Sequence, residues 1–438
     1  MFKRKIQIDL ENYYKNTSEQ KILIVYGARQ VGKSYIIRNT AKSFFKNYAE
    51  IDLKDDYETN KMFSNVQTTK DFYTLVSSLF GGLNNSGDTI IFLDEIQFYP
   101  HLMTLLKPLA KERKYRYIVS GSLLGITLRH SFIPMGSITE KRLFPMDFEE
   151  FLWANNYGET AIEELKNCFI NLKEVNQSVH EYTLRLFQDY LLSGGLPDAV
   201  NEYIINQNVS KMRQVQNEIH TYYKDDCSKY DEEHNLKIRR IFDLLPSNMA
   251  NKVKRIQFKS IEGKDDSNLD KYEDEFDYLF DSGISLPSRA VSNPVFPLVQ
   301  SKSKNLIKAY FNDVGLLTDI LYKNNVFAVL NKDSGINLGS VYETAAAMEL
   351  IAHGHELYYF DSKKVGEVDF LINNYDSLSI VPIEIKSGND QNNFRAIPKL
   401  VDPNGNYKLS YGYIFGNKNT VKKDGNLITL PIYMIMFL

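Results

Sequence analysis

The chain has 438 residues, a net charge of −3 at pH 7 and a hydrophobic content of 43 %. This length allows about two to four domains, and the composition is that of a globular protein rather than a disordered or fibrous one. The nearly balanced charge excludes a strongly basic protein, so a nucleic-acid site would have to be a local patch.

The cysteines and the apolar runs indicate the compartment. Cys168 and Cys227 lack the spacing of metal ligands and favour a reducing, cytoplasmic setting. The first residues lack the apolar core of a signal peptide. The longest apolar run, residues 428–438, contains Pro431 and is too short to span a bilayer. We therefore expect no membrane association, and we interpret this run as a last core strand.

A glycine-containing loop lies between a predicted strand and a predicted helix near the N-terminus. The apolar run Ile22–Tyr26 is typical of a buried parallel strand, and a helix is predicted from Tyr35 onward. The pattern Gly-x-x-x-x-Gly-Lys-Ser in this context predicts a site whose backbone N–H groups bind the phosphates of ATP. The alternative is a strand-to-helix turn that merely needs glycine. The predicted binding residues are Gly27, Ala28, Arg29, Gln30, Val31, Gly32, Lys33 and Ser34.

Two acids follow the next strongly apolar strand. Residues 89–93 are followed by Asp94 and Glu95, about 60 residues beyond the loop. In open α/β sheets the carboxyl ends of the strands carry the ligand site. Lys33 would contact the β- and γ-phosphates, Ser34 and Asp94 would hold Mg²⁺, and Glu95 would polarise the attacking water. Without the loop, the two acids would read as a solvated strand end.

Three further residues of this region are weaker candidates. Ser120 ends a third predicted strand and would either contact the γ-phosphate or the attacking water, or cap the next helix. Arg129 and Arg142 are candidates for an arginine finger that completes a neighbouring site, with a surface or ion-pairing role as the alternative for each.

Several motifs resemble a family of bacterial and archaeal AAA-type ATPases. They are Gly27–Ser34, Leu93–Gln97, Ser120–Gly125, Phe144–Leu152, Ser193–Pro197, Asn312–Leu317 and Gly366–Ile372. The resemblance implies an α/β fold with a P-loop parallel sheet, a helical and winged-helix-like middle, and a C-terminal nuclease-like domain of the restriction-endonuclease type. We accordingly expect an ATPase domain at 1–152, a helical lid at 153–234, a winged-helix-like region at 235–325 and the nuclease-like domain at 326–438.

The middle of the chain is dominated by helical patterns. The aromatic stripe formed by Tyr182, Phe187 and Tyr190 reads as core, within a helical lid that we expect to pack on the ATPase domain. Residues 252–259 carry four positive charges in eight positions, between two predicted helices. Such a basic segment is typical either of a winged helix that contacts DNA or of a solvated surface or hinge.

The C-terminal region predicts an αβββαβ core with charged residues on neighbouring strands. Glu343 lies on an alanine-rich helix, Asp369 on the second strand, and Glu384 and Lys386 on the third, where alternate residues share a face. This Asp and Glu-x-Lys arrangement resembles the active site of the restriction-type endonuclease fold. Asp369, Glu384 and Glu343 would bind a second Mg²⁺ or Mn²⁺, and Lys386 would orient or deprotonate the attacking water.

Two functions fit these patterns. The first is an ATP-driven enzyme that presents DNA or RNA to a nuclease-like site. The second is a signalling or scaffold ATPase, in which the nucleotide controls homo-oligomer assembly or partner binding and the last domain only docks.

Overall fold

The structure is a computed structural model that describes residues 2–16, 21–83, 88–122, 124, 136–227, 232–250, 256–263, 269–330, 336–388 and 394–438. The chain divides into two compact units. The first consists of residues 3–144 together with 281–283, and the second of residues 145–280 and 284–438.

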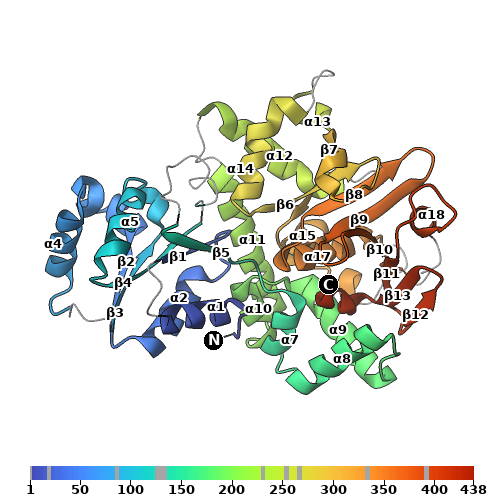
Figure 1. Ribbon diagram of the computed structural model, residues 1–438, viewed down its shortest axis with the longest axis horizontal. Coiled ribbons are helices and arrows are strands. Elements are labelled where there is room, and N and C mark those ends of the chain that lie inside the picture. The colour runs from blue at the N-terminus through green and yellow to red at the C-terminus, as the bar shows by residue number, and fades with distance from the viewer. Residues whose placement is uncertain are drawn as a thin grey trace. The chain divides into compact units, whose positions relative to one another are not determined.

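A five-stranded parallel sheet forms the centre of the first unit (Figure 1). The strand order is β2-β3-β4-β1-β5, and every pair of neighbours is parallel. All six residues of β3 are buried, as expected for an apolar strand in the middle of such a sheet. The strands are β1 (Ile22–Tyr26), β2 (Asn47–Asp52), β3 (Thr89–Asp94), β4 (Arg116–Gly121) and β5 (Ile138–Arg142).

Helices pack on this sheet because its strands are apolar on both faces. Phe72 and Val76 of one helix and Leu106 of another share a core cluster with Ile91 and Leu93 of β3. The intervening residues of β3 face the opposite side, where α2 contacts β2 and β3. The helices are α1 (Ile6–Lys15), α2 (Lys33–Phe44), α3 (Leu53–Glu58), α4 (Thr69–Leu79) and α5 (Leu102–Glu112), with 3-10 turns η1 (Met62–Asn65) and η2 (Ile96–Phe98).

An eight-stranded mixed sheet forms the centre of the second unit, in the order β12-β13-β11-β10-β9-β8-β6-β7 (Figure 1). Strands β8, β9 and β10 form an antiparallel meander, and β11 pairs parallel with β10. The strands are β6 (Ser285–Val291), β7 (Lys302–Phe311), β8 (Leu357–Ser362), β9 (Gly366–Asn374), β10 (Ser379–Ile385), β11 (Gly412–Gly416), β12 (Lys422–Asp424) and β13 (Leu427–Pro431).

Helices of the second unit come from both the middle and the end of the chain. Helix α17 is buried from Ser340 to Leu350 and contacts β6, β7, β8 and β10. The helices are α7 (Phe148–Ala154), α8 (Glu159–Asn171), α9 (Gln177–Ser193), α10 (Pro197–Ile204), α11 (Val209–Asp226), α12 (Glu232–Ala250), α13 (Lys259–Glu262), α14 (Glu273–Asp281), α15 (Val314–Tyr322), α16 (Phe327–Leu330), α17 (Gly339–Ala352) and α18 (Ile397–Val401), with 3-10 turns η4 (Leu269–Tyr272), η5 (Leu298–Ser301) and η6 (Ile432–Phe437).

The predicted lid differs from the observed packing. Helices α8 to α11 belong to the second compact unit and not to the unit that holds the parallel sheet. Phe187 and Tyr190 of α9 are buried against Phe148 of α7, and Phe187 also meets Tyr342 of α17. The aromatic stripe is therefore core in part, but this core is shared with the C-terminal helix, and Tyr182 is exposed.

The predicted boundary at residues 325 and 326 also differs from the structure. The predicted helices of the middle region lie within α12 and α14. Strand β6, however, pairs parallel with β8, so β6 and β7 extend the C-terminal sheet. A boundary between two folds cannot separate strands that share backbone hydrogen bonds. Residues 252–255, half of the basic segment, lie outside the described residues.

The final apolar run is only partly a strand. Strand β13 ends at Pro431, and residues 432–437 form the 3-10 turn η6. Proline lacks the N–H group that a sheet ladder needs, which accounts for the end of the strand. Within the described parts of the chain, no helix combines the length and the apolar character needed to cross a bilayer.

Candidate functional sites

The glycine loop has a backbone shape that its glycines make possible. Gly27 has a φ of 148°, and a Cβ added there would lie 2.1 Å from the carbonyl oxygen of Leu143. Gly32 has a φ of 90° and immediately precedes α2. Gln30, between them, is left-handed with a φ of 64°. A side chain at Gly27 would collide with the neighbouring strand connection, so the loop needs glycine there.

Lys33 begins α2 and turns back over the loop. Its side chain is 5 % exposed, and Nζ donates to the carbonyl oxygens of Gly27 (3.0 Å) and Ala28 (2.8 Å). Arg29 Nε donates to Ser122 Oγ at 3.4 Å. The first two residues of the loop therefore accept hydrogen bonds from a buried ammonium group beyond the carboxyl end of β1.

Arg4 is a loop contact that the sequence motif did not reveal. Its guanidinium donates to the carbonyl oxygens of Val31 (3.1 Å) and Phe144 (2.7 Å). It therefore ties the loop to the segment that follows β5. No sequence motif marks this arginine, because the segment just before α1 lies beside the loop only in the fold.

Asp94 lies beside the loop, at the tip of β3. Its Oδ1 accepts a hydrogen bond from Ser120 Oγ on the adjacent strand β4, and the Ser34 hydroxyl also donates to this carboxylate. Burial raises the pKa of Asp94, and the hydrogen bonds from Ser120 and Ser34 and the charge of Lys33 oppose that rise. The structure therefore brings together the side chains that were predicted to hold Mg²⁺.

Glu95 is held by a network of its own. It has a left-handed backbone, with a φ of 56°. Its Oε2 accepts from the Ser122 hydroxyl (2.9 Å), from the Ser122 N–H (3.2 Å) and from Gln97 Nε2. Burial by itself raises the pKa of Glu95, but the charge of Lys33 and the hydrogen bonds from Gln97 and Ser122 together lower it. Gln97 and Ser122 were not predicted as site residues.

The structure describes one of the two arginine-finger candidates. Arg142 is on β5, with its guanidinium 5.0 Å from the centre of the Phe144 ring. This contact is compatible with the local role that was the alternative for Arg142. Arg129 lies outside the described residues.

In the second unit, three of the predicted charged residues are neighbours. Ile383 pairs with Phe370, which brings Glu384 beside Asp369. Asp369 Oδ2 accepts from the Ile385 N–H at 2.8 Å, and Lys386 Nζ lies 2.7 Å from Glu384 Oε1. The proximity expected from the alternation of strand residues is thus present.

Glu384 is a buried acid with an unpartnered oxygen and a shifted pKa. It is 8 % exposed, and its Oε2 makes no hydrogen bond with any described residue. Burial and the charge of Asp369 raise the pKa of Glu384 to about 8, although Lys386 acts in the opposite direction. A buried carboxylate oxygen of this kind is costly without a partner.

Glu343, the predicted third metal ligand, is less close to Asp369 and Glu384 than they are to each other. Glu343 on α17 is 3 % exposed, and its charge also raises the pKa of Glu384. Among the described residues, only Asp147, Glu349 and His353 form a trio of acidic, histidine or cysteine ligand atoms that all lie within 4.8 Å of one another. The ligand atoms of Glu343, Asp369 and Glu384 are therefore more widely spaced than this.

The trio has a structural explanation. Asp147 caps α7 by accepting from the Glu150 N–H at 2.9 Å, and Glu349 accepts from the Phe148 N–H. His353 Nε2 lies 3.5 Å from Asp147 and 3.9 Å from Glu349. We interpret the group as a polar cluster that joins the start of α7 to α17.

Comparison with known proteins assigns the first unit. Residues 19–152 match the AAA domain family. This part of the chain is an AAA-type ATPase domain. Residues 184–326 and 338–434 match two domains of unknown function (DUF8612 and DUF4143). Among curated proteins, none matches the chain significantly.

Solved structures with some likeness to the chain are distant. A Walker-type ATPase of Pyrococcus abyssi is 15 % identical, with 73 % of this chain and 95 % of that chain covered and a TM-score of 0.44. The replication initiator DnaA, bound to AMPPCP and single-stranded DNA, is 13 % identical over 64 % and 92 %, with a TM-score of 0.30. RuvB of Thermotoga maritima is 14 % identical over 64 % and 86 %, with a TM-score of 0.28. TM-scores this low do not establish a shared overall fold.

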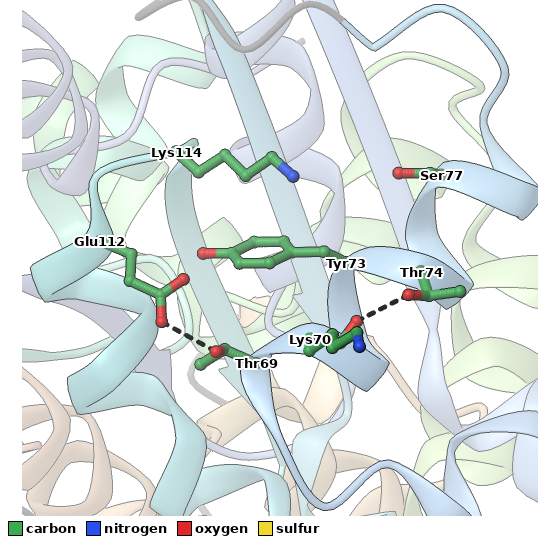
Figure 2. A pocket seen from close by; sticks show the side chains of 7 residues that line it. All are labelled: Thr69, Lys70, Tyr73, Thr74, Ser77, Glu112 and Lys114. Atoms are coloured by element: carbon green, nitrogen blue, oxygen red, sulfur yellow. Dashed lines mark hydrogen bonds between the residues drawn. The ribbon is translucent and has the colours of Figure 1, made fainter.

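A surface pocket of about 530 Å³ in the AAA domain is lined by side chains of α4 and by Glu112 and Lys114 (Figure 2). Lys114 lies over the Tyr73 ring, with Nζ 4.2 Å from its centre, and Thr69 donates to Glu112 at 2.8 Å. Lys114 precedes β4, so the pocket is at the amino-terminal edge of the sheet, whereas the glycine loop is at the carboxyl-terminal edge. This pocket is therefore separate from the predicted nucleotide site.

Proposed function

We propose that the AAA domain binds ATP with Mg²⁺ and hydrolyses it. The observation that carries this proposal is the meeting of Lys33, Ser34 and Asp94 at the carboxyl ends of β1 and β3. The loop N–H groups and the start of α2 provide donors for phosphate oxygens. Lys33 would exchange the carbonyl oxygens of Gly27 and Ala28 for phosphate oxygens, since a charge-assisted contact to phosphate is the stronger one.

The acids at the strand ends suit a magnesium ion. Ser34 and Asp94 offer a hydroxyl and a carboxylate oxygen that already meet, the oxygen ligands that Mg²⁺ prefers. Mg²⁺, when bound, would neutralise charge on the phosphate oxygens. Ser120 would then keep Asp94 in position through its hydrogen bond. Glu95 stays ionised near Lys33, as a residue that orients and polarises an attacking water must.

We propose further that the C-terminal sheet carries a nuclease-like site for DNA or RNA that takes a second Mg²⁺ or Mn²⁺. The supporting observation is the buried Glu384 Oε2, which lacks a hydrogen-bond partner in the described structure and lies beside Asp369. A divalent cation would satisfy this oxygen, with Asp369 and Glu384 as ligands and Glu343 brought closer by the ion. Lys386 would then leave Glu384 and orient or deprotonate the attacking water.

The test of the nuclease-like site is a plasmid-nicking assay with Mg²⁺ or Mn²⁺. We expect cleavage by the wild-type chain and its loss in Asp369→Ala and Lys386→Ala, with the exposed Lys422→Ala as control. Absence of cleavage with either metal would favour the second function, a switch in which the nucleotide controls homo-oligomer assembly or partner binding. Sedimentation with and without ATP would then detect the assembly. Free, buried Cys168 and Cys227 agree with a cytoplasmic setting for either function.

A further inference from the structure

Strand β7 carries a buried charged residue, Lys308, that interacts with acids of the C-terminal region. Lys308 is 1 % exposed, although β7 is the last strand at one edge of the sheet. Lys308 pairs with Ser288 on β6, and Ser288 in turn pairs with Leu357 on β8. Helix α17, which carries Glu343, contacts β6, β7 and β8.

The partners of Lys308 connect it to the site. Its Nζ lies 2.5 Å from Glu367 Oε1 on β9 and 4.6 Å from the centre of the Tyr359 ring. Burial by itself lowers the pKa of Lys308, but the neighbouring acidic groups of Tyr310, Glu343, Glu367 and Asp369 together raise it well above the ordinary value. Lys308 therefore remains an ammonium group, and the acids that stabilise it include two of the proposed metal ligands.

The charges of the cluster do not balance, and Lys308 reduces the excess of negative charge. Glu343, Glu367, Asp369 and Glu384 are four carboxyl groups, and Lys308 and Lys386 are two ammonium groups. When all are ionised, two negative charges remain, which equals the charge that one divalent cation neutralises. Removing Lys308 would leave three negative charges in a largely buried space.

We propose that Lys308 is a positioning residue of the C-terminal metal site, where it holds Glu367 and restrains the affinity of the acids for a divalent cation. This inference rests on the proposed metal site. Lys308 lies in residues 184–326, outside the segment that carries Asp369 and Glu384, so the site is composed from two parts of the chain. The alternative is an ion pair that only stabilises the sheet.

The two interpretations predict opposite changes in metal affinity. A purely structural lysine, once removed, would loosen the site and weaken Mn²⁺ binding. A lysine that restrains affinity through its charge would, once removed, strengthen it. Like charges repel over several ångströms inside a protein, and a divalent ion doubles the effect.

The test is a titration of the full chain with Mn²⁺ at pH 8 without nucleotide, with free Mn²⁺ measured by electron paramagnetic resonance. The C-terminal site is the binding that Asp369→Ala removes. We expect Lys308→Met to lower the Kd of this site by about tenfold. Lys308→Arg should restore the wild-type Kd, and Lys422→Met on the exposed strand β12 should leave it unchanged.

A second variant keeps the test decisive if Lys308→Met does not fold. The Glu367 side chain is 36 % exposed, so Glu367→Gln should be tolerated, and it should raise the Kd because it removes a negative charge. Wild-type chain without Asp369-dependent Mn²⁺ binding would overturn the metal site and this inference with it. Binding by the wild type with an unchanged or weaker Kd in Lys308→Met, or an unchanged Kd in Glu367→Gln, would overturn the inference alone.

Discussion

The two candidate sites are built in different ways. In the AAA domain, the loop and the strand tips meet because every strand of a parallel sheet ends at the same edge. In the second unit, the charges come from strands that run in both directions and from a helix laid across them. In the first site the acids accept hydrogen bonds from hydroxyl, amide and backbone groups and lie near the charge of Lys33, whereas in the second site buried acids repel one another. The difference suggests that the first site is organised before its ligand binds, and that the second depends on a cation for its final geometry.

The largest expected effect separates the two sites. Lys33→Ala should reduce ATP hydrolysis by about 10² to 10³-fold, because it removes the charge that would contact the phosphates. The measurement is steady-state phosphate release, with the exposed Lys46→Ala as matched control. Mn²⁺ binding that depends on Asp369 should be unchanged, and a change there would show that the two sites are coupled.

A second change separates binding from hydrolysis in the AAA domain. Glu95→Gln keeps the hydrogen-bonding shape but cannot polarise a water as a carboxylate does, so hydrolysis should fall by about 10² to 10³-fold while ATP binding is kept. Calorimetry measures binding and phosphate release measures turnover, and exposed Glu58→Gln is the control. Equal losses of binding and turnover would assign Glu95 to the architecture of the loop instead.

The claim that the loop is organised in advance can be tested at Gly27. A Cβ there would lie 2.1 Å from Leu143 O, so Gly27→Ala should lower the free energy of unfolding by about 2 kcal/mol and weaken ATP binding. Chemical denaturation checks the stability. Gly81→Ala is the matched control, because its Cβ would meet no atom within 4 Å. Equal stability of the two variants would show that the loop adapts without cost.

The smallest expected effect concerns Glu384, one of the neighbouring acids of the C-terminal site. The pKa of Glu384 is raised to about 8, so between its unfolded value and pH 8 the folded chain holds a proton that the unfolded chain has lost. The contribution of Glu384 to the free energy of unfolding is therefore fully present below the pKa of the unfolded chain. It is lost as the pH rises through about 8. Glu384→Gln should therefore raise the Tm at pH 8 to 9 in EDTA, with little change near pH 4. The control, exposed Asp424→Asn, should keep the dependence of Tm on pH that the wild type shows. If Glu384→Gln also keeps it, the pKa of Glu384 in the wild type is not raised.

Much of the AAA domain could be predicted because its signals are local. An apolar run, two glycines and a lysine–serine pair specify β1, the loop and the start of α2. An apolar run followed by two acids likewise specifies β3. The contacts of Arg4 with Val31 and Phe144, and of Gln97 with Ser122, could not be predicted, because each joins residues that only the fold brings together. The strands and helices of the C-terminal core also follow their sequence patterns, from α17 to β11.

The amino-acid sequence by itself determined which segments are strands, which glycines bend the loop, and which acids stand at strand ends, since these depend on neighbours within a few residues. Only the tertiary structure decided that β6 and β7 extend the C-terminal sheet, that α9 packs in the second unit, and that Lys308 joins the acids. Each of these depends on which apolar faces find each other across long separations in the chain, and hydrophobic burial is not directional enough for a local pattern to specify its partner.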